Sequence, residues 1–392
     1  MSRAARRSRS LIALAILLAP IACAPEPDPR PNVLLLVGNG LRAAHLGARG
    51  NLREPSSPHL DALARSSLRF VRAYAASAQA RASLAAILTG HASASPGVPA
   101  NEVSTLAESL HNAGYTTGAA SGQLDLLERS GLLQGFDLRR DPQPANRTAG
   151  AIDPPFGAAL ELLDELAAGR APWLLFVHQG QLGQLDQLDQ LDHRGAAEAR
   201  ERYAARLHAA DAGLGELVAR LAALGVADRT LIAVTADHGV ALDPRGPAIG
   251  QSLHEEMIRV PLLLRPPRGV EPRAIQPPVS LLSLAPTLLE LAGVAVAAER
   301  FAAPTLSEWL FGDPARPAAN AVFSELGAQR AVIEARYKLI LDGASGEARL
   351  YDLAADPGEK HDLARQQPAL RGRLERLLSA RPEAAATDLS PR

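Results

Sequence analysis

The chain has 392 residues, of which 47% are hydrophobic and 21% are charged, so it can bury a large core and lacks the composition of a disordered protein. Its 41 basic and 42 acidic residues give a formal net charge of -1, which leaves no overall basic field to hold a nucleic-acid backbone. Its single cysteine excludes an intramolecular disulfide and a zinc site built from several thiolates. Composition therefore predicts one or two folded domains and no nucleic-acid partner.

Residues 1–22 have the pattern of a signal peptide. Four arginines and no acidic residue precede an uncharged, mostly aliphatic run that begins at Leu11. The run is shorter than the roughly 20 residues that span a membrane, and Pro20 interrupts it, so we expect cleavage rather than a retained span. The only cysteine, Cys23, follows in the context LLAPIAC and opens a proline-rich linker over residues 23–31.

The segment around Cys23 resembles a bacterial lipobox, with Pro20 at the position where leucine is commonest. We therefore expect export to the bacterial periplasm or cell envelope. Two acyl chains on Cys23 would hold the protein stably at a membrane surface. The alternative interpretation is an incidental cysteine beside an ordinary cleavage site.

Four short, nearly continuous apolar runs are typical of strands buried on both faces, and they lie at 32–37, 172–178, 230–236 and 259–265. Helical patterns separate them, at 58–67, 81–89, 105–113, 156–168, 197–224 and 281–293. The residues Thr105-x-x-Glu108 have the form of a capping box. The alternation predicts an α/β domain over residues 32–300, with a mostly parallel central sheet flanked by helices.

Beyond residue 300 the elements become short strands, followed by one last helical pattern at 367–379. They predict a small C-terminal α+β subdomain over residues 301–380 with its own antiparallel sheet, and a flexible tail over 381–392. The sequence QLGQLDQLDQLD at 181–192 repeats every three residues, a period that keeps neither a helix face nor a strand face in register. We expect a surface loop there.

Polar side chains follow two of the predicted strands, and ligands of open α/β sheets bind at the carboxyl ends of strands. The first run leads into Asn39, and the third leads into Asp237 and His238, which offer an oxygen and a nitrogen to a divalent metal. Ser77 lies near the start of a predicted helix with Arg81 one turn later, as a nucleophile beside an oxyanion-binding group would. The structural alternatives are a turn with a capping Asp and a serine that caps the helix.

From residue 31 to about residue 380 the chain resembles the sulfatases of the alkaline-phosphatase superfamily. The resemblance rests on motifs in the same order, among them RPNVLLLVGNGLRAAHLG, SAQARASLAAILTG, TLIAVTADHG, HEEMIRVPLLLR and RYKLI…LYDLAADPGEKHDLA. It implies the sulfatase fold and hydrolysis of sulfate esters by a formylglycine made from the Cys or Ser of C/S-x-P-x-R, beside a calcium ion. By that resemblance Ser77 is the formylglycine precursor and Arg81 binds sulfate, while Asn39, Asp237 and His238 surround the cation.

Several positions depart from the sulfatase pattern. The Asp-Asp pair after the first strand is replaced by Asn39 and Gly40, although calcium prefers six to eight oxygens, several of them charged. The signature over residues 77–81 reads S-A-Q-A-R and lacks its proline. His91 stands at a position where the sulfatase pattern has Arg or Lys. Loss of one charged contact to a transferring group commonly costs about 10²–10³ in rate. Together these changes predict a degenerate site.

Three hypotheses remain open. The one we favour is an exported sulfatase-family protein that is catalytically impaired and acts as a binding or structural protein of the envelope. In it, Asp237, His238 and Arg81 either persist as turn and hydrogen-bonding elements of the scaffold or retain metal or anion binding. The second is an active sulfatase that hydrolyses a sulfated small molecule or glycan, with formylglycine from Ser77 and an atypical Ca²⁺ shell. The third is a metal-dependent phosphoesterase that uses Ser77 unmodified.

Overall fold

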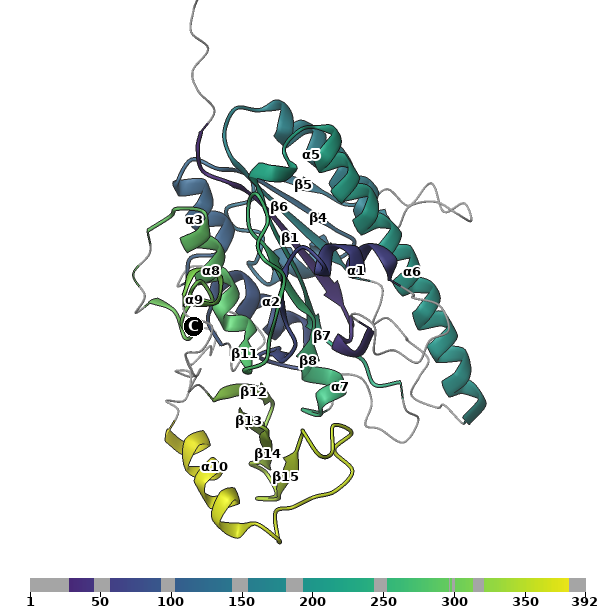
Figure 1. The fold of residues 1–392 in the computed structure, drawn as a ribbon, viewed down its shortest axis with the longest axis vertical. Helices are drawn as coiled ribbons and strands as arrows, with labels where there is room; N and C mark the ends of the chain where they lie inside the picture. The colour runs from purple at the N-terminus through teal and green to yellow at the C-terminus, as the bar shows by residue number, and fades with distance from the viewer. Residues whose placement is uncertain are drawn as a thin grey trace, which may run out of the picture.

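The computed structural model describes residues 28–45, 57–92, 103–142, 154–180, 193–242, 252–295, 297, 300–312 and 321–380. The predicted signal peptide, Cys23, the repeat at 181–192 and the C-terminal tail lie outside the described residues. An eight-stranded sheet forms the centre of the molecule, in the order β10-β2-β9-β7-β1-β6-β4-β5 (Figure 1). Its strands are β1 (Asn32–Asn39), β2 (Leu68–Phe70), β4 (Thr116–Ser121), β5 (Leu138–Arg140), β6 (Trp173–Gln179), β7 (Thr230–His238), β9 (Leu262–Arg265) and β10 (Arg273–Ile275).

The sheet is mostly parallel, as predicted. β1 pairs in parallel with β6 and β7, β4 pairs in parallel with β5 and β6, and β10 pairs in parallel with β2. β9 alone among these strands runs antiparallel to its neighbours β2 and β7. The carboxyl ends of β1, β2, β4, β6, β7 and β10 therefore lie along one edge, which is where ligands of such sheets bind.

Helices cover both faces of the sheet (Figure 1). On one face lie α1 (Pro58–Ala64), α5 (Pro154–Ala168) and α6 (His193–Ala223), and on the other lie α2 (Ala80–Thr89), α3 (Leu106–Asn112) and α8 (Leu284–Leu291). Every residue of β1, β6 and β7 is consequently buried, which explains why their sequences are continuous apolar runs rather than in-out alternations.

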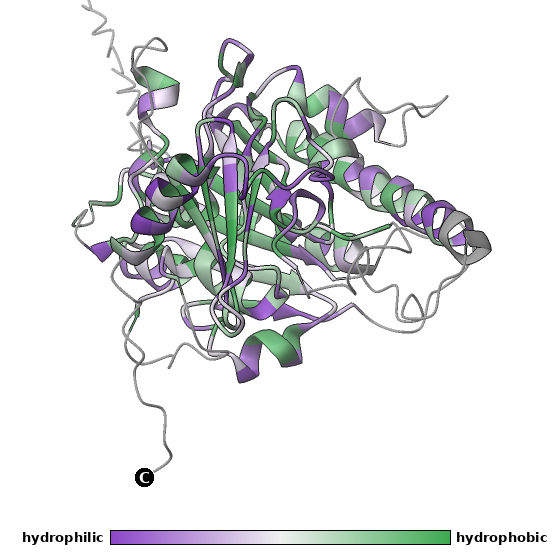
Figure 2. Cartoon of the chain, turned by 90° about the horizontal axis from the view of Figure 1, so that it is seen from below, coloured by the Kyte–Doolittle hydropathy of each residue, from purple (hydrophilic) through white to green (hydrophobic). Residues whose placement is uncertain are grey.

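The long helix α6 shows how the helices attach to this sheet. Its buried side chains recur every three or four residues, which places them on one face, while Figure 2 shows hydrophilic residues between them. They are Ala199, Tyr203, Leu207, Ala210, Leu214, Leu217 and Leu221. The buried Asp211 on the same helix accepts hydrogen bonds from the backbone N–H groups of His59 and Leu60, at 3.0 and 2.7 Å. It thereby provides acceptors for N–H groups of the first turn of α1 that have no partner within the helix.

The predicted capping box is confirmed at the start of α3. The Glu108 N–H donates to Thr105 Oγ1 at 3.0 Å, and the Thr105 N–H donates to Glu108 Oε2 at 2.8 Å. The turn at Gly135 packs directly on this cap, because a Cβ at Gly135 would lie 2.2 Å from the Glu108 nitrogen. Gly135 also has a φ of +80°, a conformation that favours glycine.

The apolar run at 259–265, predicted as one strand, forms two. Pro261, which has no N–H to donate, separates β8 (Arg259–Val260) from β9. β8 joins β3 (Ala73–Tyr74) and β11 (Val279–Ser280) in a separate three-stranded sheet. The helical pattern at 281–293 likewise divides into a 3-10 turn, Leu281–Ser283, and α8.

β4 is a strand that the apolar pattern did not indicate. Its sequence, TTGAAS, contains no aliphatic run, yet five of its six residues are buried. The side chain of Leu166 on α5 fills the space above Gly118, where a Cβ would lie 3.1 Å from Leu166 Cδ1. Small residues here allow the helix to approach the sheet closely, and that requirement comes from packing rather than from strand propensity.

A C-terminal subdomain, residues 321–380, forms a four-stranded antiparallel sheet, confirming the expectation of a separate antiparallel unit. The strands follow in chain order as β12 (Val322–Leu326), β13 (Gln329–Glu334), β14 (Tyr337–Asp342) and β15 (Ala348–Asp352), and α10 (Pro368–Ala380) packs against β13 and β14. Residues 300–312, including α9 (Glu308–Phe311), belong instead to the large domain, because Leu306, Trp309 and Leu310 are part of its core. No helix among the described residues is long and apolar enough to span a membrane.

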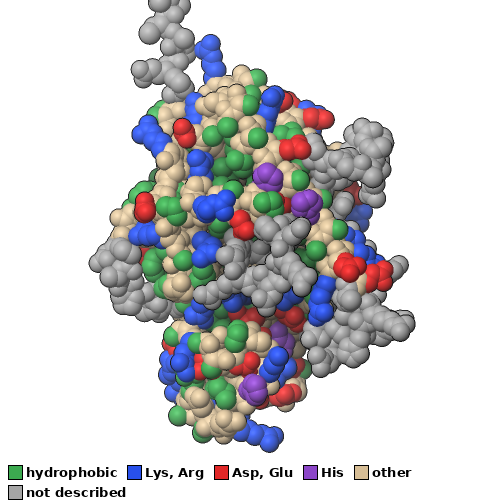
Figure 3. Space-filling view, turned by 45° about the vertical axis from the view of Figure 1, so that its right-hand side comes forward, with side chains coloured by type: hydrophobic (Ala, Val, Ile, Leu, Met, Phe, Trp, Pro, Cys, Tyr) green, Lys and Arg blue, Asp and Glu red, His purple; other side chains and the backbone are tan. Residues whose placement is uncertain are grey.

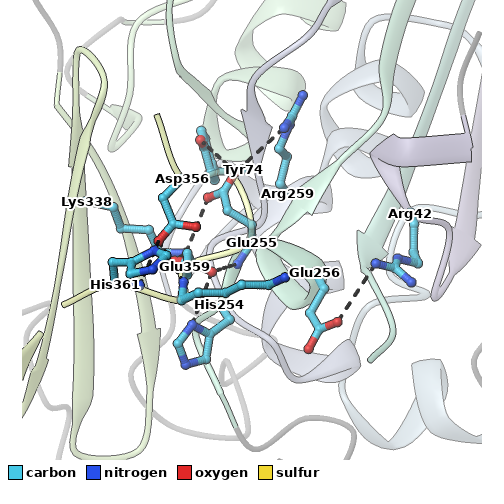
Figure 4. A network of polar contacts seen from close by, with 11 residues as sticks. Arg42, Tyr74, His254, Glu255, Glu256, Arg259, Lys338, Asp356, Glu359 and His361 are labelled. Atoms are coloured by element: carbon cyan, nitrogen blue, oxygen red, sulfur yellow. Dashed lines mark hydrogen bonds and ion pairs between the residues drawn. The ribbon is translucent and has the colours of Figure 1, made fainter. Parts of the chain in front are cut away.

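A buried polar network fastens the subdomain to the large domain (Figure 4). Lys338 of β14 is fully buried, with Nζ 2.9 Å from Glu359 Oε1 and 3.3 Å from Glu255 Oε1 at the start of α7 (Glu255–Ile258). Glu359 Oε2 accepts the Glu255 N–H at 2.6 Å and lies 3.1 Å from His254 Nδ1. Burial opposes ionisation of Glu359, but Lys338 and His254 outweigh it and lower its pKa to about 2.

Candidate active site

Asn39, Asp237 and His238 lie together at the carboxyl edge of the central sheet. Asn39 ends β1, and Asp237 and His238 end β7. The register between these strands shifts at this point: Gly38 pairs with Ala236 and Asn39 pairs with His238, so Asp237 has no partner opposite it. Such irregularities re-aim side chains next to functional sites. All three side chains are buried, and Asp237 is completely so.

Their polar atoms contact one another directly. Asn39 Nδ2 donates to Asp237 Oδ2 at 2.9 Å and lies 3.4 Å from His238 Nε2. The His238 N–H donates to Asp237 Oδ1 at 2.7 Å. Both carboxylate oxygens of Asp237 therefore already accept hydrogen bonds from the protein.

His178, at the end of β6, completes the surroundings of Asp237. Its Nε2 lies 3.5 Å from Asp237 Oδ2, and its Nδ1 lies 3.2 Å from Ser121 Oγ at the end of β4. Burial alone would raise the pKa of Asp237, but His238, His178 and the Asn39 amide outweigh it, so its pKa lies below the usual value. Asp237 is thus a buried carboxylate that the protein holds in its ionised form.

His178 and Ser121 were not among the residues that the sequence singled out. His178 is the last residue of the apolar run at 172–178, for which only a buried strand was predicted. Ser121 ends a strand that the apolar pattern did not indicate, although the two residues occupy paired positions of β4 and β6. The end of the predicted strand at 172–178 could have indicated His178, whereas no local pattern indicates Ser121.

Ser77 and Arg81 lie where α2 begins. The N-cap residue is Gln79, whose N–H lies 3.3 Å from Ser77 Oγ, so Ser77 is not the helix cap that the structural alternative required. Ser77 is 6% exposed and forms an isolated bridge with Glu325 of β12. α2 packs against β7, but within the described residues no hydrogen bond joins the Ser77 hydroxyl to Asn39, Asp237 or His238.

The residues around Asp237 do not fit calcium. Asp237 is the only carboxylate among the contacts described there, and the described part of the chain contains no group of three or more His, Cys, Asp or Glu side chains placed to hold a metal. Asn39 is a neutral amide, so beside Asp237 it contributes no charge to a cation site. Gly40 supplies no side chain at the position of a second carboxylate. Calcium needs six to eight oxygen ligands, several of them charged.

Comparisons with known proteins agree with this fold. The sulfatase family model matches residues 31–294. The steryl-sulfatase of Mus musculus is 27% identical over 74% of this chain and 67% of its own length. The choline-sulfatase of Rhizobium meliloti is 32% identical, over 42% of this chain and only 33% of the relative. The chain thus spans between about a third and two thirds of these relatives.

Solved structures show the same architecture. A 2-O GAG sulfatase superposes with a TM-score of 0.75 at 19% identity, covering 89% of this chain and 91% of that one. The phosphonate monoester hydrolase of Agrobacterium radiobacter superposes with a TM-score of 0.73 at 20% identity, covering 89% of this chain and 95% of that one. Since the family model accounts for well over half of the sequence, the chain belongs to the sulfatase family.

Proposed function

We propose that this member of the sulfatase family has lost sulfate-ester hydrolysis and acts as a non-hydrolytic binding or structural protein of the cell envelope. The observation that carries the proposal is the set of ligands: among the described residues of the centre Asp237 is the only carboxylate, and the neutral Asn39 lies beside it. Asn39 stands at a position where the family has an acidic ligand.

Electrostatics support this proposal. Replacement of Asp-Asp by Asn39 and Gly40 removes two negative charges from the cation site. Asp237 is ionised and buried, and Asn39, His178 and the His238 N–H surround it with the stabilisation that a cation would otherwise provide. A transferring sulfuryl group would then lack the cation that would stabilise the charge on its oxygens, and loss of one such charged contact costs about 10²–10³ in rate. We therefore expect this centre to support binding of a ligand rather than its hydrolysis.

The class of ligand is proposed from the relatives. The N-acetylglucosamine-6-O-sulfatase of Bacteroides thetaiotaomicron is 29% identical over 41% of this chain, and its name describes a sulfated sugar. We take a sulfated saccharide or a small sulfate ester as the ligand that a retained sulfatase frame would hold. Arg81, at the first turn of α2, is the described cation that the family pattern assigns to sulfate.

Calcium titration tests the centre. We expect isothermal titration of CaCl₂ into the full chain to show no binding tighter than millimolar. The Asn39→Asp variant restores one carboxylate, and we expect it to bind calcium measurably, since ligand charge tunes affinity. Micromolar binding by the natural chain that Asp237→Asn abolishes would overturn the proposal.

An active sulfatase remains the second candidate, because Ser77 keeps the convertible residue type and is not used as a helix cap. Co-expression with a formylglycine-generating enzyme, followed by mass spectrometry of the peptide containing Ser77, tests its conversion. Hydrolysis of 4-nitrophenyl sulfate by that preparation, absent in Ser77→Ala, would establish the second candidate. Unmodified Ser77 and no hydrolysis are the expected results.

Envelope attachment through Cys23 is part of the proposal. The support is the charged and apolar pattern of residues 1–22 followed by the chain's only cysteine. We expect the mature protein expressed in a bacterium to partition into the detergent phase and to begin with an acylated Cys23. The Cys23→Ser variant should move to the aqueous phase, and equal partitioning of both proteins would refute lipidation.

A further inference from the structure

A pocket of about 790 Å³ lies between the large domain and the C-terminal subdomain. On the large domain it is bounded by the ends of β2 and β10 and by the turn after β1, all at the carboxyl edge of the sheet. None of Asn39, Ser77, His178, Asp237 and His238 lines it, so it is separate from the Asp237 centre. Its volume is within the roughly 300–1,000 Å³ of ordinary ligand sites.

Among the described residues, four arginines line this pocket, namely Arg69, Arg72, Arg259 and Arg336, with one acidic residue, Glu255. Figure 3 shows Lys and Arg side chains, with acidic side chains beside them, where the large domain meets the C-terminal subdomain. The remaining walls are mostly small or apolar, including Phe70 and Leu353. The pocket is therefore a cationic hollow with apolar sides.

The charges of two of these arginines are compensated. Arg259 Nη1 lies 3.9 Å from Glu255 Oε2, and its Nε donates to the Val71 carbonyl at 3.1 Å. Arg336 forms an ion pair with Asp352. Glu255 is further engaged by the buried Lys338, which it shares with Glu359 (Figure 4).

The charges of the other two, Arg69 and Arg72, are not compensated within the described residues. Neither forms an ion pair there; the Arg72 side chain hydrogen-bonds with the Tyr74 hydroxyl, but its Nη2 is buried without a hydrogen-bond partner. Counted with their ion-pair partners, the described residues of the pocket comprise five cations and three carboxylates. A buried guanidinium N–H without an acceptor is unfavourable, so an acceptor brought by a ligand would be bound strongly.

The backbone holds Arg336 in place over the same hollow. It lies in the two-residue turn between β13 and β14, where Ala335 has a φ of +48°, an uncommon conformation for a residue with a side chain. The Arg336 carbonyl accepts the Leu353 N–H at 2.8 Å, and its guanidinium stacks over the Tyr337 ring at 5.1 Å.

From these observations we propose that the pocket is a second ligand site, which binds an oxyanion group of a ligand through Arg72 and Arg69. Sulfate, phosphate and carboxylate share the recognition chemistry, since each accepts paired N–H donors from a guanidinium fork. The apolar walls at Phe70 and Leu353 take the body of the ligand. The site contacts both domains, so occupancy also strengthens their junction.

Titration of the full chain tests the site, with sodium sulfate and sodium phosphate as separate probes at constant low ionic strength. Loss of one charge-assisted hydrogen bond predicts affinity weakened by roughly tenfold or more in Arg72→Gln and in Arg69→Gln. Arg129→Gln is the matched control, since Arg129 is an exposed arginine on α4 (Leu124–Arg129), beyond the opposite end of the sheet. Arg72→Lys keeps the positive charge but loses the guanidinium fork. Its affinity for the anion should lie between that of the natural chain and that of Arg72→Gln.

Equal affinity in the natural chain, both Gln variants and the Arg129→Gln control would overturn the proposal, as would no binding of either anion. Sedimentation with phosphatidylglycerol and phosphatidylcholine vesicles distinguishes the source of the oxyanion. Loss of phosphatidylglycerol binding in the two Gln variants identifies a lipid headgroup as the ligand. Vesicle binding that is unchanged by these variants, together with weakened sulfate or phosphate binding, identifies a soluble ligand. Calcium binding at Asp237 has no bearing on either outcome.

Discussion

Replacement of Lys338 by methionine should destabilise the protein by about 3–5 kcal/mol, because it leaves buried carboxylates without their cation. Lys338 is fully buried, and Nζ is within 3.3 Å of both Glu255 and Glu359. The lowered pKa of Glu359 points in the same direction. The pKa of Glu359 is lowered from 4.5 to about 2, and at 1.36 kcal/mol per pKa unit this corresponds to about 3 kcal/mol of favourable interaction, in which Lys338 is the largest attractive partner.

The chain offers a matched control, since Lys360 is its only other lysine and is exposed. Urea unfolding followed by circular dichroism at pH 7 gives the free energy of unfolding for Lys338→Met and Lys360→Met. We expect Lys360→Met to remain within about 0.5 kcal/mol of the natural chain. The double variant Lys338→Met/Glu359→Gln should recover part of the lost free energy of unfolding, because it removes one of the buried carboxylate charges that Lys338 no longer compensates.

A loss below about 1 kcal/mol in Lys338→Met, equal to that of Lys360→Met, would refute the reasoning. It would mean that water or another cation reaches the two carboxylates, and that the junction between the domains does not depend on the ion pair.

Three further predictions concern stability. Because the folded pKa of Glu359 is about 2 and the reference value is 4.5, its contribution is complete above pH 4.5 and is lost as the pH falls toward 2. The free energy of unfolding of Glu359→Gln should therefore fall less between pH 4.5 and pH 2 than that of the natural chain. An identical pH dependence in the two proteins would contradict the assignment to Glu359. Gly135→Ala should cost about 3 kcal/mol or more by thermal unfolding, since the new Cβ meets the Glu108 backbone. Gly225→Ala, with a φ of +67° but open space around it, should cost only about 1–2 kcal/mol; equal losses would show that steric contact is unimportant. Thr105→Ala should cost about 1 kcal/mol by urea unfolding, whereas Thr105→Ser, which keeps the capping oxygen, should cost less; the opposite order would argue against the capping box.

The sequence determined the layers of this fold. Long apolar runs produce strands that must be covered on both faces, so β1, β6 and β7 and the helices between them were predictable from hydrophobic pattern alone. The capping box at Thr105 was also readable, since it depends on residues three positions apart. The family followed from the order of motifs, and with it the residues that should meet at the strand ends.

Tertiary structure decided the surroundings of those residues. That Asn39 donates to Asp237 depends on a register shift between β1 and β7, which no local pattern encodes. His178 and Ser121 join the centre only because β4 and β6 pair, and β4 itself is made a strand by the packing of α5 on Gly118. The arginine pocket likewise needs the subdomain to dock before Arg336 and Arg72 line the same hollow. Local sequence fixes the conformation of neighbours along the chain, whereas contacts between residues far apart in the chain exist only once the sheet has formed and the domains have docked.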